Sequence, residues 1–357
     1  MPALDRFSPV ARAWFEAAFE APTEAQERGW EAISGGDHTL ILAPTGSGKT
    51  LAAFLWALDR LATTEAPADE KNRLKVLYVS PLKALTYDIE RNLRAPLAGM
   101  AMEAERRGLP VPTIRVATRT GDTSQSDRRD LVRHPPDILV TTPESLYLML
   151  TSQAREVLRS VEHVIVDEIH SVAPTKRGAH LALSLERLER LTTAKGPPQR
   201  IGLSATQRPL DEVARFLGGR ARDPQTGEWH PRPVHVVDAG VRKPLELQVV
   251  VPVEDMAELG RVVPDMLVGP AAGDPEVRHS IWPAIHPVLL DLIRAHTSTL
   301  IFVNSRRLAE RLAARLNELA TQQSETGEPV ELVRAHHGSI AREQRLEIED
   351  ALKAGKL

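Results

Sequence analysis

The sequence contains no cysteine among its 357 residues. Without thiols, the chain can form neither disulfide bonds nor cysteine-ligated zinc sites, and a reducing cytoplasm is the compartment that we expect. Aromatic residues are also scarce, at 4% of the chain, although 42% is hydrophobic. We therefore expect cores built from leucine, valine, isoleucine and alanine.

Long apolar runs and a strong excess of charge are also missing. No apolar stretch approaches the roughly 20 residues that a membrane-spanning helix needs. The first residues, Met1 to Arg6, lack the basic and apolar regions of a signal peptide. The formal net charge is −3, so any polyanion would have to bind in a local basic groove. We expect no membrane partner.

A nucleotide-binding pattern begins at Thr39–Leu42, an apolar run that predicts a short buried strand. A glycine loop ending in Gly48-Lys49-Thr50 and a strong helix-forming segment follow, and this order is the phosphate-binding loop of nucleoside triphosphatases. Lys49 would place its charge on the β and γ phosphates, and the Thr50 hydroxyl would hold Mg²⁺. The predicted nucleotide-binding residues of the loop are Thr45, Gly46, Ser47, Gly48, Lys49 and Thr50.

Short aliphatic runs alternate with helical segments from Thr39 onward. Nearly continuous aliphatic runs are typical of strands buried on both faces, which indicates an α/β fold with a parallel sheet covered by helices. The expected strands of the first part are 39–42, 75–80, 113–117, 137–141, 163–167, 200–204 and 234–237. The expected helices are 50–62, 83–95, 144–150 and 178–191, after two helices within 7–33, the second with Thr23 as N-cap and Gln26 completing a capping box.

The character of the chain changes after Gly219, where 220–233 is interpreted as a loop and 239–244 as a linker. We therefore expect an ATP-binding domain at 1–240 and a second unit at 241–357. In the second unit we expect strands at 245–253, 299–304 and 330–335, and helices at 283–296, 305–320 and 341–354. Residues 255–280 are interpreted as a surface insertion.

Two acidic residues, Asp167 and Glu168, follow the apolar strand that ends at Val166. Ligands of open parallel sheets bind at the carboxyl ends of strands, which would place both beside the phosphate loop. Asp167 can hold Mg²⁺, directly or through water, and Glu168 can position and deprotonate the attacking water. Ser204 and Thr206 end the next strand, where their hydroxyls could bond to His170 or Asp167 and sense the nucleotide.

Three segments, Ala43–Thr50, Asp167–His170 and Ser204–Thr206, resemble motifs I, II and III of superfamily 2 helicases in wording, order and spacing. With Ser-Pro-Leu-Lys-Ala-Leu from Ser80 as motif Ia, the chain is most similar to the large helicase-related (Lhr) family. The resemblance implies a RecA-like first lobe, an incomplete second RecA-like lobe, and ATP as cofactor. It adds His170 to the catalytic residues Lys49, Asp167 and Glu168. It also makes Gln26 a reader of the adenine edge, for which helix capping is the alternative.

The same resemblance implies nucleic-acid contacts on both lobes, by Lys83, Arg119, Thr142, Asn304 and Arg306. Solvated surface side chains are the alternative for each, and Arg128-Arg129 is interpreted as part of a solvated helix face. His336-His337 would position nucleic acid or neighbouring groups rather than bind a metal.

The function implied by the resemblance is ATP-dependent 3′-to-5′ translocation on single-stranded DNA, with unwinding of DNA or RNA:DNA duplexes. Two alternatives stay open: an RNA helicase, and a nucleotide-gated nucleic-acid binding module without sustained hydrolysis. Motifs V and VI, whose arginines close over ATP, are not found in the sequence. An arginine finger contributes about 10³–10⁵ in turnover, so we expect an N-terminal motor fragment that hydrolyses ATP slowly without a C-terminal remainder.

Overall fold

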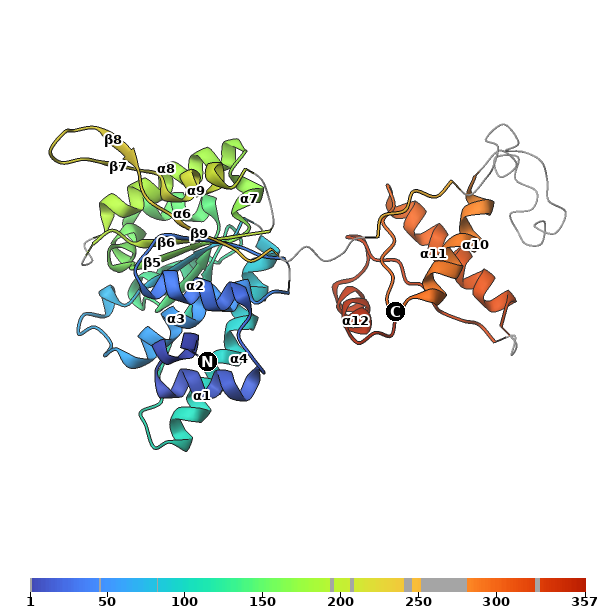
Figure 1. Ribbon diagram of the computed structural model, residues 1–357, viewed down its shortest axis with the longest axis horizontal. Helices are drawn as coiled ribbons and strands as arrows, with labels where there is room; N and C mark the ends of the chain where they lie inside the picture. Colours follow the sequence, from blue (N-terminus) through green and yellow to red (C-terminus); the bar gives the residue numbers. More distant parts are fainter. Residues whose placement is uncertain are drawn as a thin grey trace. The chain divides into compact units, whose positions relative to one another are not determined.

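The computed structural model describes residues 2–44, 46–81, 83–192, 196–205, 209–240, 246–251, 281–324 and 328–357. The chain divides into two compact units, Met1–Pro244 and Leu245–Leu357 (Figure 1). Among the described residues, no helix is long and apolar enough to cross a membrane.

A seven-stranded sheet in the order β3-β4-β2-β5-β6-β1-β9 forms the centre of the first unit. Every neighbouring pair is parallel, which confirms the predicted α/β fold. Because the strands are parallel, their carboxyl ends lie at one edge of the sheet. The strands are β1 (Thr39–Leu42), β2 (Val76–Val79), β3 (Val116–Arg119), β4 (Ile138–Thr141), β5 (His163–Val166), β6 (Gln199–Ser204) and β9 (His235–Asp238).

Helices cover both faces of this sheet (Figure 1). Successive strand side chains point to opposite faces, so Ile41 packs into one hydrophobic cluster while Leu40 and Leu42 pack into another. The first cluster includes side chains of η1 (Pro2–Arg6), α1 (Pro9–Ala18), α2 (Glu24–Ser34), α3 (Lys49–Thr63) and α4 (Lys83–Arg106). The second includes side chains of α5 (Gln125–Arg133), α6 (Pro143–Leu150), η3 (Gln153–Ser160), α7 (Ile169–Val172), α8 (Lys176–Leu191) and α9 (Leu210–Gly218). A short turn of 3-10 helix, η2 (Glu70–Asn72), precedes β2.

Three predictions for the first unit need correction. The helix predicted at 83–95 continues to Arg106. The segment 220–233, interpreted as a loop, contains an antiparallel hairpin of β7 (Arg220–Arg222) and β8 (Trp229–Pro231). Its strands are three residues each and exposed, so they carry no apolar alternation that would reveal them in the sequence. The third strand, predicted at 113–117, instead runs from Val116 to Arg119.

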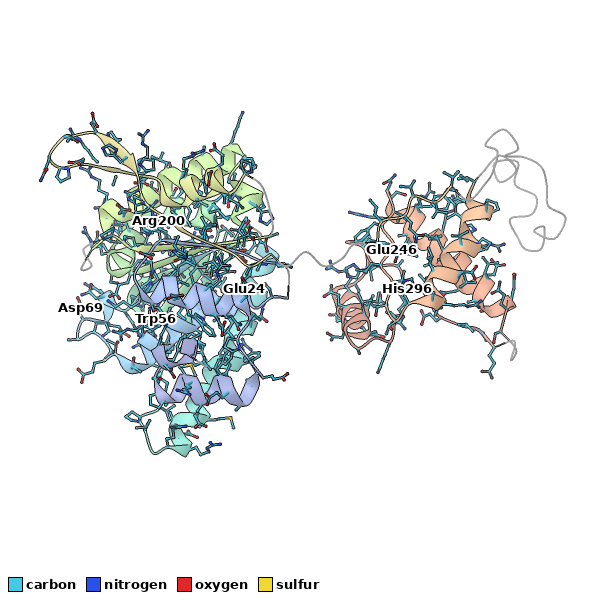
Figure 2. The ribbon with its side chains drawn as sticks, in the orientation of Figure 1. Glu24, Trp56, Asp69, Arg200, Glu246 and His296 are labelled. Carbon is cyan, nitrogen blue, oxygen red and sulfur yellow. The ribbon has the colours of Figure 1, made fainter. Side chains whose placement is uncertain are left out.

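A buried arginine ties several elements of the first unit together. The Arg200 side chain in β6 is only 2% exposed, and its guanidinium contacts Glu186 at 3.0 Å and Glu189 at 2.7 Å, both in α8 (Figure 2). It also donates to two carbonyls at the end of α9. Arg232, just before β9, pairs with the same two glutamates at 2.8 and 2.6 Å. Two cations and two anions thus join β6, α8, α9 and the segment that leads into β9.

The second unit contains three helices in its described part, α10 (Trp282–Ala295), α11 (Arg306–Gln322) and α12 (Arg342–Lys353), near the predicted positions. The strand predictions are wrong for the described residues 246–251, 299–304 and 330–335, none of which forms a strand. The predicted insertion at 255–280 lies outside the described residues.

In the second unit, backbone groups of Leu332 and Val333 hydrogen-bond to a side chain instead of to a neighbouring strand. Asn317 of α11 accepts hydrogen bonds from the N–H groups of Leu332 and Val333 and donates to the Val333 carbonyl.

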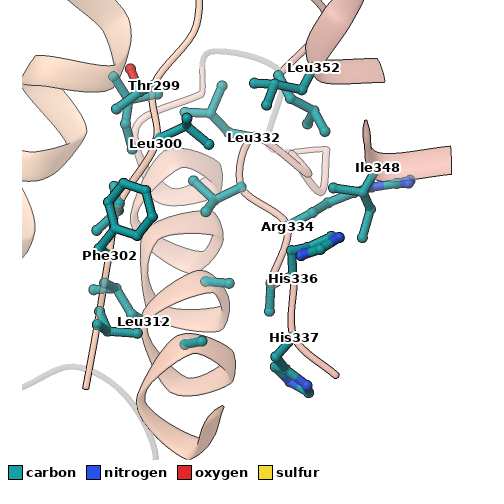
Figure 3. A pocket seen from close by; sticks show the side chains of 18 of the residues that line it. Thr299, Leu300, Phe302, Leu312, Leu332, Arg334, His336, His337, Ile348 and Leu352 are labelled. Atoms are coloured by element: carbon teal, nitrogen blue, oxygen red, sulfur yellow. The ribbon is translucent and has the colours of Figure 1, made fainter. Parts of the chain in front are cut away.

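The segments 299–304 and 332–337 line opposite parts of one cavity of about 710 Å³ (Figure 3). A strand needs a hydrogen-bonded neighbour, and an apolar run in the sequence cannot show whether one is present.

Candidate functional site

The phosphate-binding loop connects β1 to α3 at the carboxyl edge of the sheet. Gly46 and Gly48 have φ values of 81° and 77°, in the left-handed region that favours glycine. A Cβ on Gly48 would also lie 2.4 Å from Nε2 of Gln26. The backbone conformation therefore favours glycine at position 48, and a larger residue there would displace the Gln26 amide. Thr45 lies outside the described residues.

Lys49 begins α3 with a side chain folded over the loop. Its Nζ donates to the carbonyls of Ala43, at 2.5 Å, and Pro44, at 3.0 Å. Burial lowers the pKa of Lys49, and the negative charges of Glu168 and Asp167 oppose that shift. The structure thus brings the lysine and the acidic pair, far apart in the sequence, into one electrostatic site.

The predicted capping box at the start of α2 is confirmed. The Thr23 hydroxyl accepts from the Gln26 N–H at 3.3 Å, and Gln26 Oε1 accepts from the Thr23 N–H at 3.0 Å. The same two side chains reach the phosphate loop, where Thr23 donates to the Ser47 carbonyl at 2.8 Å and Gln26 Nε2 to the Gly48 carbonyl at 3.4 Å. The start of helix α2 is therefore fixed to the phosphate loop by two hydrogen bonds. Adenine recognition by Gln26 stays a prediction.

Asp167 follows β5 and is 7% exposed. Its Oδ2 accepts a hydrogen bond from the Tyr78 hydroxyl at 2.5 Å, and its Oδ1 accepts from the Glu168 N–H at 2.9 Å. Burial raises the pKa of Asp167, while these two donors and the charge of Lys49 act in the opposite direction. Two donors fix the orientation of the carboxylate, which is a hard oxygen ligand of the kind that Mg²⁺ prefers.

Glu168 is the one non-glycine residue with positive φ among the described residues, at φ 42°. Such a conformation costs about 1–3 kcal/mol and is concentrated at functional sites. The Glu168 carboxylate lies 3.3 Å from Nε2 of His170.

His170 links Glu168 to the end of β6. The Ala205 N–H donates to its Nδ1 at 3.3 Å, and the Ser204 hydroxyl lies 3.2 Å from the same atom. Nδ1 is therefore an acceptor, which places a ring proton on Nε2, facing Glu168. The predicted pairing of Ser204 with His170 is present. Thr206 lies outside the described residues.

The predicted nucleic-acid residues of the first unit lie at the end of β3 and just after β2 and β4, at the same edge of the sheet. Arg119 ends β3, is 9% exposed, and accepts at its carbonyl from the Thr141 hydroxyl at 2.7 Å. Thr142 is 2% exposed and caps α6, accepting from the Ser145 N–H at 3.4 Å. Arg119 and Thr142 thus lie at the ends of paired strands. Lys83 begins α4, but its side chain is outside the described part.

In the second unit, the segment of the predicted nucleic-acid residues Asn304 and Arg306 contacts the segment that follows His336-His337. Arg306 Nη1 donates to the Ser339 hydroxyl at 2.7 Å, and Asn304 is exposed nearby in sequence. His336 and His337 lie 3.0 and 2.9 Å from carboxylates, those of Glu349 and Glu310.

Two residues of the site were missed by the sequence reasoning. Tyr78 lies in the apolar run of β2, and its hydroxyl was the only signal. Arg177 of α8 donates to the Glu144 carboxylate and, at 2.5 Å, to the Pro81 carbonyl, joining the first turn of α6 to the loop that follows β2. No local pattern around Arg177 indicates that contact.

Glycine loop, buried lysine, acidic pair and parallel sheet together define a nucleotide-binding site of the phosphate-loop class. The profile of the DEAD/DEAH box helicase family matches residues 23–214, more than half of the chain. The chain belongs to this family.

Longer proteins resemble the chain along nearly its whole length. The Lhr helicase/probable uracil glycosylase of Mycolicibacterium smegmatis is 51% identical over 99% of this chain and 23% of that protein. The Lhr helicase/uracil glycosylase of Escherichia coli is 46% identical over 99% of this chain and 24% of that protein. The chain therefore spans about a quarter of the length of these relatives.

Among solved structures, the M. smegmatis helicase Lhr bound to single-stranded DNA and AMP-PNP is 53% identical to the chain, with a TM-score of 0.75. The match covers 99% of this chain and 41% of that one. The predicted similarity to Lhr helicases is thereby confirmed.

Proposed function

We propose that the chain is the motor part of an ATP-dependent helicase that binds ATP and Mg²⁺ and moves along a nucleic-acid strand. The convergence of Lys49, Asp167, Glu168 and His170 at one sheet edge carries this proposal. We further propose that Leu245–Leu357 is the first portion of a second RecA-like lobe. The M. smegmatis structure contains AMP-PNP, which supports nucleotide binding here.

The roles of the side chains follow from their positions. Lys49 would bind the β and γ phosphates, and loop and helix N–H groups would complete the phosphate cradle. Thr50 and Asp167 would hold Mg²⁺, which neutralises charge on the phosphates when bound. Glu168 would take a proton from the attacking water, and the His170 Nε2–H would hold the Glu168 carboxylate in place. Ser204, bonded to His170, would report the state of this site to β6.

The proposed track is single-stranded DNA, because the M. smegmatis relative was solved with single-stranded DNA. Movement in the 3′-to-5′ direction and unwinding of DNA or RNA:DNA duplexes are proposed from the similarity to Lhr helicases alone. The test compares matched DNA and RNA oligonucleotides as activators of ATP hydrolysis. Stronger stimulation by DNA is expected. Stronger stimulation by RNA would support an RNA helicase, and nucleotide-dependent release of the strand without turnover would support a binding module.

Lys49→Ala should weaken nucleotide binding by about 10–100-fold, because a charged hydrogen bond of about 1.5–3 kcal/mol to phosphate is lost. Titration with a fluorescent ATP analogue measures the affinity. Lys176→Ala, which removes an exposed lysine, is the matched control and should bind like the wild type. Equal affinities for both variants would remove Lys49 from the phosphate site.

Tyr78→Phe should raise the Mg²⁺ concentration needed for nucleotide binding by about tenfold. Groups that orient a metal ligand typically contribute 10–100-fold to metal affinity. Phenylalanine preserves the stacking on Phe54, whose ring centroid lies 5.1 Å away, and removes only the hydroxyl that holds Asp167. Mg²⁺ titrations of the analogue complex measure the effect, with Tyr147→Phe on α6 as control. An unchanged Mg²⁺ requirement would leave Tyr78 with a packing role alone.

A further inference from the structure

Two arginines without acidic partners lie together where β3 ends. Arg119 is the last residue of β3, and Arg128 belongs to α5, which begins after a short turn. Arg128 Nη2 donates to the carbonyls of Thr120, at 3.4 Å, and Gly121, at 2.9 Å, so its guanidinium lies against the turn that Arg119 enters. Among the described residues, neither arginine forms an ion pair.

Each guanidinium also has an unused donor. Arg119 Nη1 and Arg128 Nε are shielded from solvent and have no hydrogen-bond partner in the described part of the chain. Buried donors are nearly always paired in folded proteins, so these two unpaired donors require an explanation. Burial lowers the pKa of Arg119, and the nearby positive charge of Arg128 lowers it further. An anion held by both guanidiniums would relieve the repulsion between them.

The turn between the two arginines is itself held rigidly. The Thr123 hydroxyl accepts from the Thr120 N–H at 2.9 Å, and the Thr120 hydroxyl accepts from the Asp122 N–H at 3.2 Å. The Ser124 hydroxyl then caps α5 by accepting from the Asp127 N–H at 3.2 Å. Because the turn is fixed and Arg128 donates to two of its carbonyls, the Arg128 guanidinium stays near Arg119. A fully solvated side chain would have no such fixed position.

We propose that Arg119 and Arg128 form one phosphate-binding subsite for the backbone of the nucleic-acid strand, with Arg128 as a second ligand to the phosphate that Arg119 contacts. The inference rests on the proposed function and corrects the interpretation of Arg128 as a solvated side chain. Paired guanidiniums match the oxygen geometry of a phosphate, and phosphate contacts of this kind position a strand without reading its sequence.

The experiment measures binding of a fluorescein-labelled oligothymidylate to the 357-residue chain across a series of salt concentrations. Each neutralised phosphate of a single strand contributes about 0.7 to the slope of log affinity against log salt. Arg119→Ala and Arg128→Ala should each weaken binding by up to about fivefold at 0.1 M salt, with the difference vanishing near 1 M. The double variant should lose less than the product of the two single losses, because both residues serve one phosphate.

Two further variants separate charge from folding. Arg129→Ala removes the neighbouring exposed arginine of the same helix and should bind like the wild type. Arg128→Lys keeps the charge but not the two carbonyl contacts, and it should recover most of the affinity lost in Arg128→Ala. Thermal unfolding followed by circular dichroism checks that each variant is folded.

The outcomes distinguish the two proposals. If the wild type binds with strong salt dependence but Arg128→Ala matches Arg129→Ala, the subsite is wrong and the proposed function stands. Losses that multiply in the double variant would assign the arginines to separate phosphates and also overturn the shared subsite. If the wild type shows no salt-dependent binding, both the subsite and the nucleic-acid part of the proposed function fail.

Discussion

Glu168→Gln should reduce the rate of ATP hydrolysis by about 10²–10⁴-fold while nucleotide affinity changes little. The amide preserves the size of the side chain and can still contact His170, but it cannot accept a proton from the attacking water. Lys49, Asp167 and the loop glycines are untouched, so the phosphates and Mg²⁺ should still bind. Single-turnover hydrolysis with enzyme in excess, alongside equilibrium titration of a fluorescent ATP analogue, measures the two effects separately.

Glu105→Gln is the matched control, because it makes the same chemical change at an exposed position of α4. It should hydrolyse ATP at the wild-type rate. Normal hydrolysis by Glu168→Gln would show that another group accepts the proton. A large loss of affinity in that variant would instead give Glu168 a role in binding.

The second large effect concerns stability. Arg200→Ala should lower the free energy of unfolding by about 3–5 kcal/mol, because breaking a buried ion pair is strongly destabilising and Arg232 alone would remain to pair with both glutamates. The side chain is 2% exposed and holds two glutamates and two carbonyls, so alanine would leave a polar cavity between β6 and α8. Denaturant unfolding of the wild type and the variant measures the difference.

Arg215→Ala provides the comparison for Arg200. Arg215 pairs with Glu212 on the surface of α9, where the side chains are 56% and 66% exposed. Surface ion pairs contribute about 0–1 kcal/mol, so this variant should unfold almost like the wild type. If both arginine variants lost the same small amount, the Arg200 cluster would be no more important than a surface pair.

The sheet of the first unit could be predicted from the sequence because its strands are buried on both faces. Runs such as Val164-Ile165-Val166 have no polar alternation, and they are short and bounded by turns. The same reasoning was wrong for 299–304, which contains the apolar run Leu300 to Val303, and for 330–335, which contains Leu332-Val333 between charged residues. Whether an extended segment becomes a strand depends on its neighbour, and Asn317 supplies backbone hydrogen bonds that composition does not reveal.

In the candidate site, too, local patterns could be predicted from the sequence and contacts between distant residues could not. The phosphate loop and the capping box are local patterns, in which a few adjacent residues determine the geometry, and both could be read directly. The Tyr78–Asp167 hydrogen bond joins residues 89 positions apart, and the Arg200–Glu186 pair joins neighbouring elements through buried space. Such contacts follow from strand order, which a single sequence does not supply.

The adjacency of β2 and β5 has a thermodynamic consequence. Tyr78 holds Asp167 from β2, and the loop that follows β2 leads to Lys83, a predicted contact of the nucleic-acid strand. If strand binding shifts β2 and thereby changes nucleotide affinity by some factor, linkage requires nucleotide to change strand affinity by the same factor. Tyr78→Phe should then reduce both factors together. The Tyr78 hydroxyl would thus determine the size of the coupling between nucleotide binding and strand binding.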